Sequence, residues 1–159
     1  MNLFFRTIGA FGVLGGAFFL QFVVSAYSSG IFFLPAVALY VSTFLPVAHA
    51  AVLGIVLGGM LDALSPLMFG VYMASFGISM VGARVGMRFV DEKKLIAHGI
   101  VGGVFLGVFL VVEGGFFFAM GYRDELMYLF IRDSMVSGIV LVLMIFAHAL
   151  CLQIFKKHI

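Results

Sequence analysis

Residues Gly54 to Gly70 read GIVLGGMLDALSPLMFG, an apolar segment with one acid, a Ser-Pro break and a second apolar segment. Residues four apart lie on one face of a helix. Ala50, Gly54, Gly58 and Asp62 therefore form one stripe of small residues that ends in a carboxylate. Small residues let another helix approach closely, and an acid in an apolar segment is costly unless it faces protein or water. The stretch predicts a helical hairpin in which Asp62 marks a polar site or partner contact, or lies at the membrane surface.

The Ser-Pro break predicts where the second helix of this hairpin begins. Ser65 belongs to the residue types that cap helix starts. Pro66 suits the first position of a helix, where no amide hydrogen is needed. We expect Ser65 to cap a helix that starts at Pro66.

The composition is that of an integral membrane protein. The 159 residues are 64% hydrophobic and 10% charged, whereas soluble domains are nearer ~45–50% apolar and ~25% charged. Long uninterrupted apolar runs favour helices over the alternating pattern of a membrane β-barrel. The net charge of +2 and the lack of a basic tract argue against nucleic-acid binding. Cys151 is the only cysteine, which excludes an intrachain disulfide and two-cysteine redox or zinc motifs.

The apolar runs predict an all-α bundle of six transmembrane helices in a single domain, residues 1–159. Each span needs about 20 residues, and a retained first span is favoured over a signal peptide, whose apolar region has only ~7–15 residues. The expected spans are about 7–27, 31–45, 47–64, 66–83, 95–120 and 134–155. The polar segment 121–133 is expected to form a short interfacial helix.

Basic residues predict the orientation of this bundle. Six spans put both termini and the charged loop 84–94 on one side, with seven Lys and Arg residues against two on the other. Cytoplasmic segments carry the excess of Lys and Arg. Both termini are therefore expected in the cytoplasm.

Three polar side chains fall in the outer halves of expected spans: Gln21, Asp62 and Glu113. Ionisable groups inside a bilayer mark functional sites by default. Because they come from three helices at similar depth, they are candidates for one layer that opens outward. For Glu113, which shares a helix face with Gly99 and Gly102, a hydrogen-bonded link between helices is an equal alternative.

Glycines at helical spacing predict faces for close helix packing. In the first span they also offer a flat face to a further helix, with ordinary packing inside the bundle as the alternative. The predicted packing positions are Gly12, Gly16, Gly54, Gly99, Gly103 and Gly107.

No metal site, cofactor or catalytic centre is predicted. The four histidines lie toward the inner ends of spans, but no pair has the i, i+4 spacing of a helical metal site. They are interpreted as interfacial polar residues. The chain has no nucleophile elbow, HExxH or glycine-rich phosphate loop. Intramembrane aspartyl proteases need two aspartates, but Asp62 has no second aspartate within a span, and Asp133 lies at the start of the sixth.

The opening stretch resembles a segment of the rod shape-determining protein MreD family. The family pattern G-x-x-x-D-x-x-S-x-x-x-x-G appears here as Gly58, Asp62, Ser65 and Gly70. The similarity in length, predicted spans and orientation covers the whole chain, and this segment is the part that is motif-like.

The resemblance implies a non-enzymatic component of the bacterial inner membrane that binds MreC and membrane lipid. It also implies indirect association with MreB, RodA and a class B penicillin-binding protein during peripheral peptidoglycan synthesis. Asp62 and Ser65 would order the hairpin, and glycine-lined faces and the segment 121–133 would contact MreC.

The family is also similar in fold to the S-components of energy-coupling-factor transporters. The alternative function is therefore a membrane subunit that binds a small molecule or vitamin for a transporter, in a pocket near Gln21, Asp62 and Glu113. A third alternative, an ion or proton pathway, would need polar residues that join these groups to the inner histidines, and the sequence offers few.

Overall fold

The computed structural model describes residues 3–27, 33–64, 70–121 and 123–156, and this part of the chain is helical without any strand. The long first helix and the short second one are α1 (Leu3–Tyr27) and α2 (Leu34–Ser42). The remaining elements are α3 (Val47–Leu64), α4 (Val71–Gly86), the 3-10 helix η1 (Met87–Phe89), α5 (Leu95–Ala119) and α6 (Arg123–Lys156).

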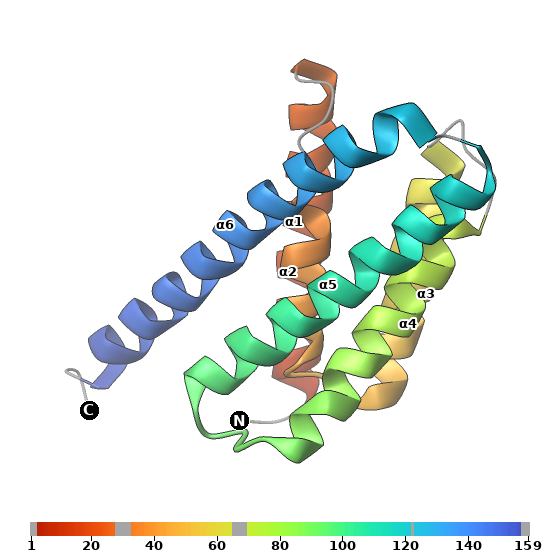
Figure 1. The fold of residues 1–159 in the computed structure, drawn as a ribbon. Helices are drawn as coiled ribbons and strands as arrows, with labels where there is room; N and C mark the ends of the chain where they lie inside the picture. Colours follow the sequence, from red (N-terminus) through yellow and green to blue (C-terminus); the bar gives the residue numbers. More distant parts are fainter. Residues whose placement is uncertain (1–2, 28–32, 65–69, 122, 157–159) are drawn as a thin grey trace.

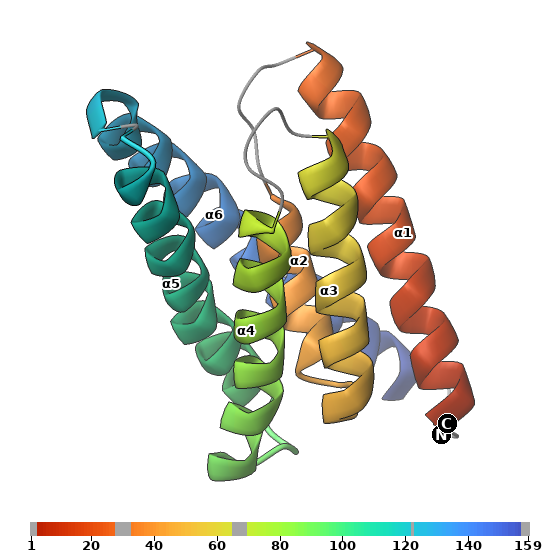
Figure 2. The same ribbon diagram turned by 90° about the vertical axis from the view of Figure 1, so that its right-hand side faces the viewer.

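Successive α-helices alternate in direction along the bundle (Figure 1). As a result, α1 begins and α6 ends at the lower end in this view, where η1 and the start of α5 also lie. We call this the η1 end. The turned view shows α2 and α4 beginning below the upper ends of α1 and α3 (Figure 2).

The helix α2 forms the centre of the bundle. All nine of its residues are buried, and α1, α4, α5 and α6 pack around it. The rings of Phe76 on α4 and Phe109 on α5 meet edge to face with their centroids 4.8 Å apart. The main core cluster contains side chains from each of the helices α1 to α5.

Two helices, α3 and α5, are long and apolar enough to cross a membrane. The apolar segments found in α1 and α6 are shorter, Ile8–Val24 and Ser134–Leu150, within the residues that the structure describes. The observed bounds of α3 match the expected span 47–64, and those of α5 differ from 95–120 by one residue.

The helix α2 is shorter than the span expected at 31–45. Nine residues rise about 14 Å, roughly half of a ~30 Å hydrocarbon core. The helix ends at Ser42, where two hydroxyls bond back to carbonyls of the last turn: Ser42 Oγ donates to Leu39 (2.7 Å) and Thr43 Oγ1 to Tyr40 (2.6 Å). Pro46 follows within one turn.

Two further expectations are wrong. The fourth helix begins at Val71 instead of Pro66. The separate interfacial helix expected at 121–133 is absent, because residues from Arg123 onward belong to α6, which continues to Lys156. No proline interrupts this stretch, and its Glu, Leu, Met and Arg residues are good helix formers.

Candidate functional site

The carboxylate of Asp62 caps the first turn of α4. Asp62 is 3% exposed, and its Oδ2 accepts hydrogen bonds from the backbone N–H groups of Gly70 (2.9 Å) and Met73 (3.0 Å). Its Oδ1 accepts one from the N–H of Tyr72 at 2.9 Å. The first N–H groups of a helix have no partner within it, and the helix dipole favours negative charge there. Asp62 therefore satisfies the start of α4 from the end of α3.

Gly70 gives the chain the turn that this cap requires. Its φ of +108° lies in a region that residues with a Cβ rarely adopt. Gly70 directly precedes α4 and donates its own N–H to Asp62. The expected cap, Ser65, and the expected first residue, Pro66, lie outside the described residues.

The predicted glycine stripe of α3 is confirmed as a packing face. A Cβ at Gly58 would collide with the backbone of Met73, and one at Gly54 would lie 2.9 Å from the carbonyl oxygen of Phe76. The two helices are therefore in backbone contact along this stripe. Gly58, Asp62 and Gly70 belong to one hairpin. Gly58 allows α4 to come close to α3, Asp62 caps the start of α4, and Gly70 makes the turn before it.

Gln21 caps α2 in the same way that Asp62 caps α4. Gln21 is buried, and its Oε1 accepts hydrogen bonds from the N–H groups of Phe33 (3.0 Å) and Leu34 (3.4 Å). Both capped helices begin below the ends of the preceding helices (Figure 2). Helix starts inside an apolar bundle need protein acceptors because water is not available to them.

Glu113 is buried on α5, on the same buried face as Gly99 and Gly102, as expected. The bonds described above place Gln21 against α2 and Asp62 against α4. A single outward-opening layer that contains all three polar residues stays a prediction.

The other predicted packing glycines divide into two groups. On α5, a Cβ at Gly99 would collide with Ile145 of α6, and one at Gly103 would lie 3.5 Å from Leu141 of α6. A Cβ at Gly12, Gly16 or Gly107 would meet nothing within 4 Å in the described part of the chain. The packing prediction is thus confirmed for Gly99 and Gly103, whereas the other three face open space.

One packing contact was not predicted from the sequence. The ring of Phe105 on α5 lies over Gly82 and Gly86 of α4, where an added Cβ would come within 2.8 Å or less of it. The four-residue spacing of these glycines is the signal that could have indicated this contact.

A polar cluster at the η1 end was also missed by the sequence analysis. His98 is buried, with Nδ1 2.9 Å from Thr43 Oγ1 and Nε2 3.1 Å from the carbonyl oxygen of Glu92. The hydroxyl of Tyr40 lies 2.7 Å from Nδ1 of His148. These residues come from the end of α2, the loop after η1, α5 and α6, so no local pattern reveals the cluster.

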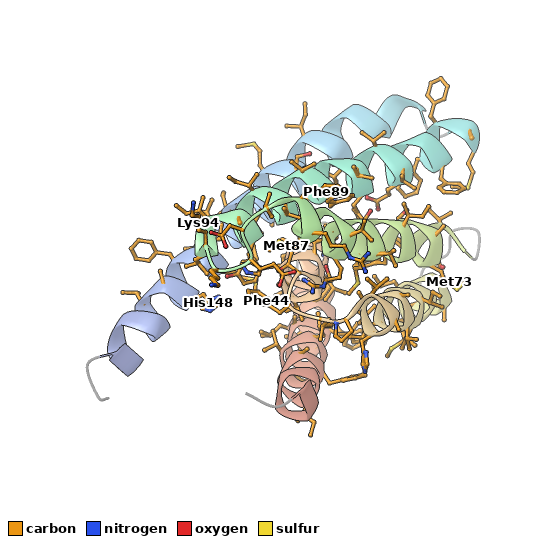
Figure 3. The ribbon with its side chains drawn as sticks, turned by 90° about the horizontal axis from the view of Figure 1, so that it is seen from below. Phe44, Met73, Met87, Phe89, Lys94 and His148 are labelled. Carbon is orange, nitrogen blue, oxygen red and sulfur yellow. The ribbon has the colours of Figure 1, made fainter. Side chains whose placement is uncertain are left out.

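Aromatic stacking and an ion pair complete this cluster. The ring of Phe44 stacks on that of His98 with centroids 4.1 Å apart. Arg84 pairs with Glu92 at 2.7 Å and donates to the carbonyl of Thr43 at 3.1 Å. The rings of Phe44 and His148 also lie close together, with centroids 5.4 Å apart (Figure 3). Among the described residues, no group of three or more His, Cys, Asp or Glu side chains is placed to hold a metal ion.

The chemistry of Gln21 and Asp62 in this arrangement is that of structural acceptors. Their side-chain oxygens accept hydrogen bonds from backbone N–H groups, which fixes helix starts. Comparisons with protein-family models, with curated proteins and with solved structures gave no match.

Proposed function

We propose that the chain is a non-enzymatic, multi-pass component of the bacterial inner membrane that binds MreC and helps to organise peripheral peptidoglycan synthesis. The observation that carries the proposal is the α3–α4 hairpin. Gly58, Asp62 and Gly70, the described residues of the segment that resembles MreD, act together in this one hairpin. A chance match would not require each of them to have a role in the same structure.

The outer surface supports a membrane environment. Large apolar side chains point outward on several helices, including Phe19 (66% exposed), Ile96 (69%) and Phe146 (66%). Helices that are apolar on all sides suit a lipid surround. The η1 end carries Arg88, Lys93 and Lys94, and we assign it to the cytoplasm, together with both termini, on the positive-inside rule.

The surface that we propose for MreC is the open face of α1. Gly12 and Gly16 are exposed there, and Phe11 and Phe19 on the same helix are exposed as well. Small residues allow the backbone of a partner helix to come close. The predicted packing glycines Gly54 and Gly58 of α3 and Gly99 and Gly103 of α5 are already covered by α4 and α6, whereas Gly12 and Gly16 form an open pair on α1.

The two capped helix starts favour this scaffold over a substrate-binding transporter subunit. In transporters, helix N-termini inside the membrane receive the anionic groups of substrates. Here Asp62 stands at the N-terminus of α4 and Gln21 at that of α2. A ligand carboxylate or phosphate at α4 would therefore meet the negative charge of Asp62.

The test is copurification of MreC with the tagged full-length protein from bacterial membranes in mild detergent. We expect the wild type to retain MreC and the double variant Gly12→Leu, Gly16→Leu to lose most of it, because leucine side chains would hold a partner helix away. Gly107→Leu is the matched control, since Gly107 also faces open space but lies on α5. Both proteins should insert into the membrane as the wild type does.

The outcomes separate the parts of the proposal. A wild-type protein that brings along no MreC overturns the function. Equal retention of MreC by the wild type and the double variant overturns the α1 face alone. Copurification of an ATPase pair with a coupling subunit would assign the chain to transport.

A further inference from the structure

The η1 end contains a cavity of about 160 Å³, lined by Phe44, Glu92, Lys93, Leu95, His98 and His148. We propose that this cavity binds a negatively charged phosphate group, of the kind carried by the headgroup of an anionic phospholipid. The inference rests on the membrane placement proposed above and is independent of MreC.

The charges around the cavity suit an anion. Lys93 contributes a positive charge that takes part in no ion pair among the described residues. Glu92 also lines the cavity, but Arg84 pairs with its carboxylate at 2.7 Å and offsets its charge. Arg84, Glu92 and Lys93 together carry a net charge of +1.

The histidines are held in place by other residues. Thr43 and the carbonyl of Glu92 engage both ring nitrogens of His98, and Phe44 stacks on its face. The Tyr40 hydroxyl engages His148 through Nδ1, and the Nε2 of His148 makes no hydrogen bond within the described residues. When Tyr40 donates to Nδ1, the ring proton lies on Nε2, which is the donor that a phosphate oxygen needs. His98 then forms a rigid wall of the cavity, and His148 and Lys93 supply the donors.

The location explains why the phosphate would belong to a lipid. Basic pockets between transmembrane helices on the cytoplasmic side bind phospholipid headgroups. Leu95 lines this cavity, and the next residue, Ile96, is 69% exposed on the outside of α5. An acyl chain could follow this apolar surface while its headgroup occupies the cavity.

The test measures binding to the purified full-length protein by native mass spectrometry and by the shift in thermal unfolding. The probes are short-chain phosphatidylglycerol, short-chain phosphatidylcholine and inorganic phosphate. We expect Lys93→Gln to bind phosphatidylglycerol about fivefold more weakly than Lys94→Gln, since a lysine near an anionic surface contributes about 1 kcal/mol. Lys94 is the matched control because it does not line the cavity.

A second variant tests whether removing a negative charge from the cavity strengthens the binding of phosphatidylglycerol. Glu92→Gln removes the negative charge from the lining and keeps the backbone carbonyl that engages His98, so we expect tighter binding. A loss that came only from a damaged fold would not strengthen binding in this variant. Equal binding by Lys93→Gln and Lys94→Gln, or no gain in Glu92→Gln, would overturn the site.

The probes distinguish the source of the phosphate. Selective binding of phosphatidylglycerol supports a lipid headgroup, and equally strong binding of inorganic phosphate supports the same site with a soluble ligand. Binding of phosphatidylcholine as tight as that of phosphatidylglycerol overturns the proposal. Alkaline extraction of the membranes tests insertion separately, so that the site can fail while the membrane placement stands.

Discussion

The backbone N–H of Tyr72 donates a 2.9 Å hydrogen bond to Oδ1 of Asp62, which lies ten residues earlier at the end of α3. This bond and its two neighbours join the end of one helix to the start of the next. They set both the position at which α4 begins and its distance from α3. Gln21 performs the same task for α2 with a neutral amide.

Replacing Asp62 by Leu removes the acceptor of three backbone N–H groups. Each buried donor left unsatisfied costs about 1–3 kcal/mol, so we expect a clear drop in the thermal unfolding midpoint in detergent. MreC copurification should weaken while the protein still inserts into the membrane. Asp62→Asn keeps one acceptor oxygen, and its unfolding midpoint should lie between those of the wild type and Asp62→Leu. The exposed neighbour offers a control, Ala63→Leu, with a midpoint near that of the wild type. Unchanged stability and unchanged MreC binding in Asp62→Leu would contradict this role.

Gly58→Ala should destabilise the hairpin, because the added Cβ would collide with the backbone of Met73. Overpacking of this kind typically costs about 1–3 kcal/mol. The adjacent variant Gly59→Ala is the control, since its Cβ would lie 4.0 Å from the flexible Met73 Sδ. Thermal unfolding of the two variants measures the difference. Equal midpoints would show that α3 and α4 are not in backbone contact.

Gly70→Ala tests backbone conformation without a change in packing. A Cβ there would meet nothing within 4 Å, but φ is +108°. Left-handed conformations cost a residue with a Cβ roughly 1–2 kcal/mol, so the unfolding midpoint should fall. Gly107→Ala also faces open space, but within a helix, and should be neutral or stabilising. A stable Gly70→Ala protein would argue against this turn.

Gln21→Leu should weaken the start of α2. The N–H groups of Phe33 and Leu34 would lose the acceptor Oε1, at about 1–3 kcal/mol for an unsatisfied buried donor. Faster hydrogen exchange at the Leu34 amide, with little change at Leu57 of α3, is the expected result. Gln21→Glu keeps an acceptor oxygen, so the Leu34 amide should stay protected from hydrogen exchange. Unchanged exchange in Gln21→Leu would show that Gln21 is not the cap.

Local patterns predicted a large part of this fold. The bounds of α3 and α5 follow from apolar runs, and the four-residue spacing of Gly54, Gly58 and Asp62 predicted the face that packs on α4. The sequence predicts a start of the fourth helix at Pro66, five residues before the observed start of α4 at Val71. The Ser-Pro pair is a strong local signal for a helix start, and it outweighed a cap that comes from another helix.

The polar cluster at the η1 end also could not be predicted from local sequence patterns. Thr43 and His98 lie 55 residues apart, and Tyr40 and His148 lie 108 apart. Single-sequence patterns contain no information about pairs at such separations. The sequence predicts His49 and His98 near the starts of two helices, as observed in α3 and α5, but it does not predict the partners of His98 and His148.

The sequence by itself determined the helical class, the apolar character and the stripe that ends in Asp62, because composition and helical periodicity are local properties. The tertiary structure decided what the polar residues do. The helices α2 and α4 begin inside the bundle, where their first N–H groups need acceptors, and only packing brings Gln21 and Asp62 to them. Packing also decided which glycines are covered by another helix and which, such as Gly12 and Gly16, remain open to a partner.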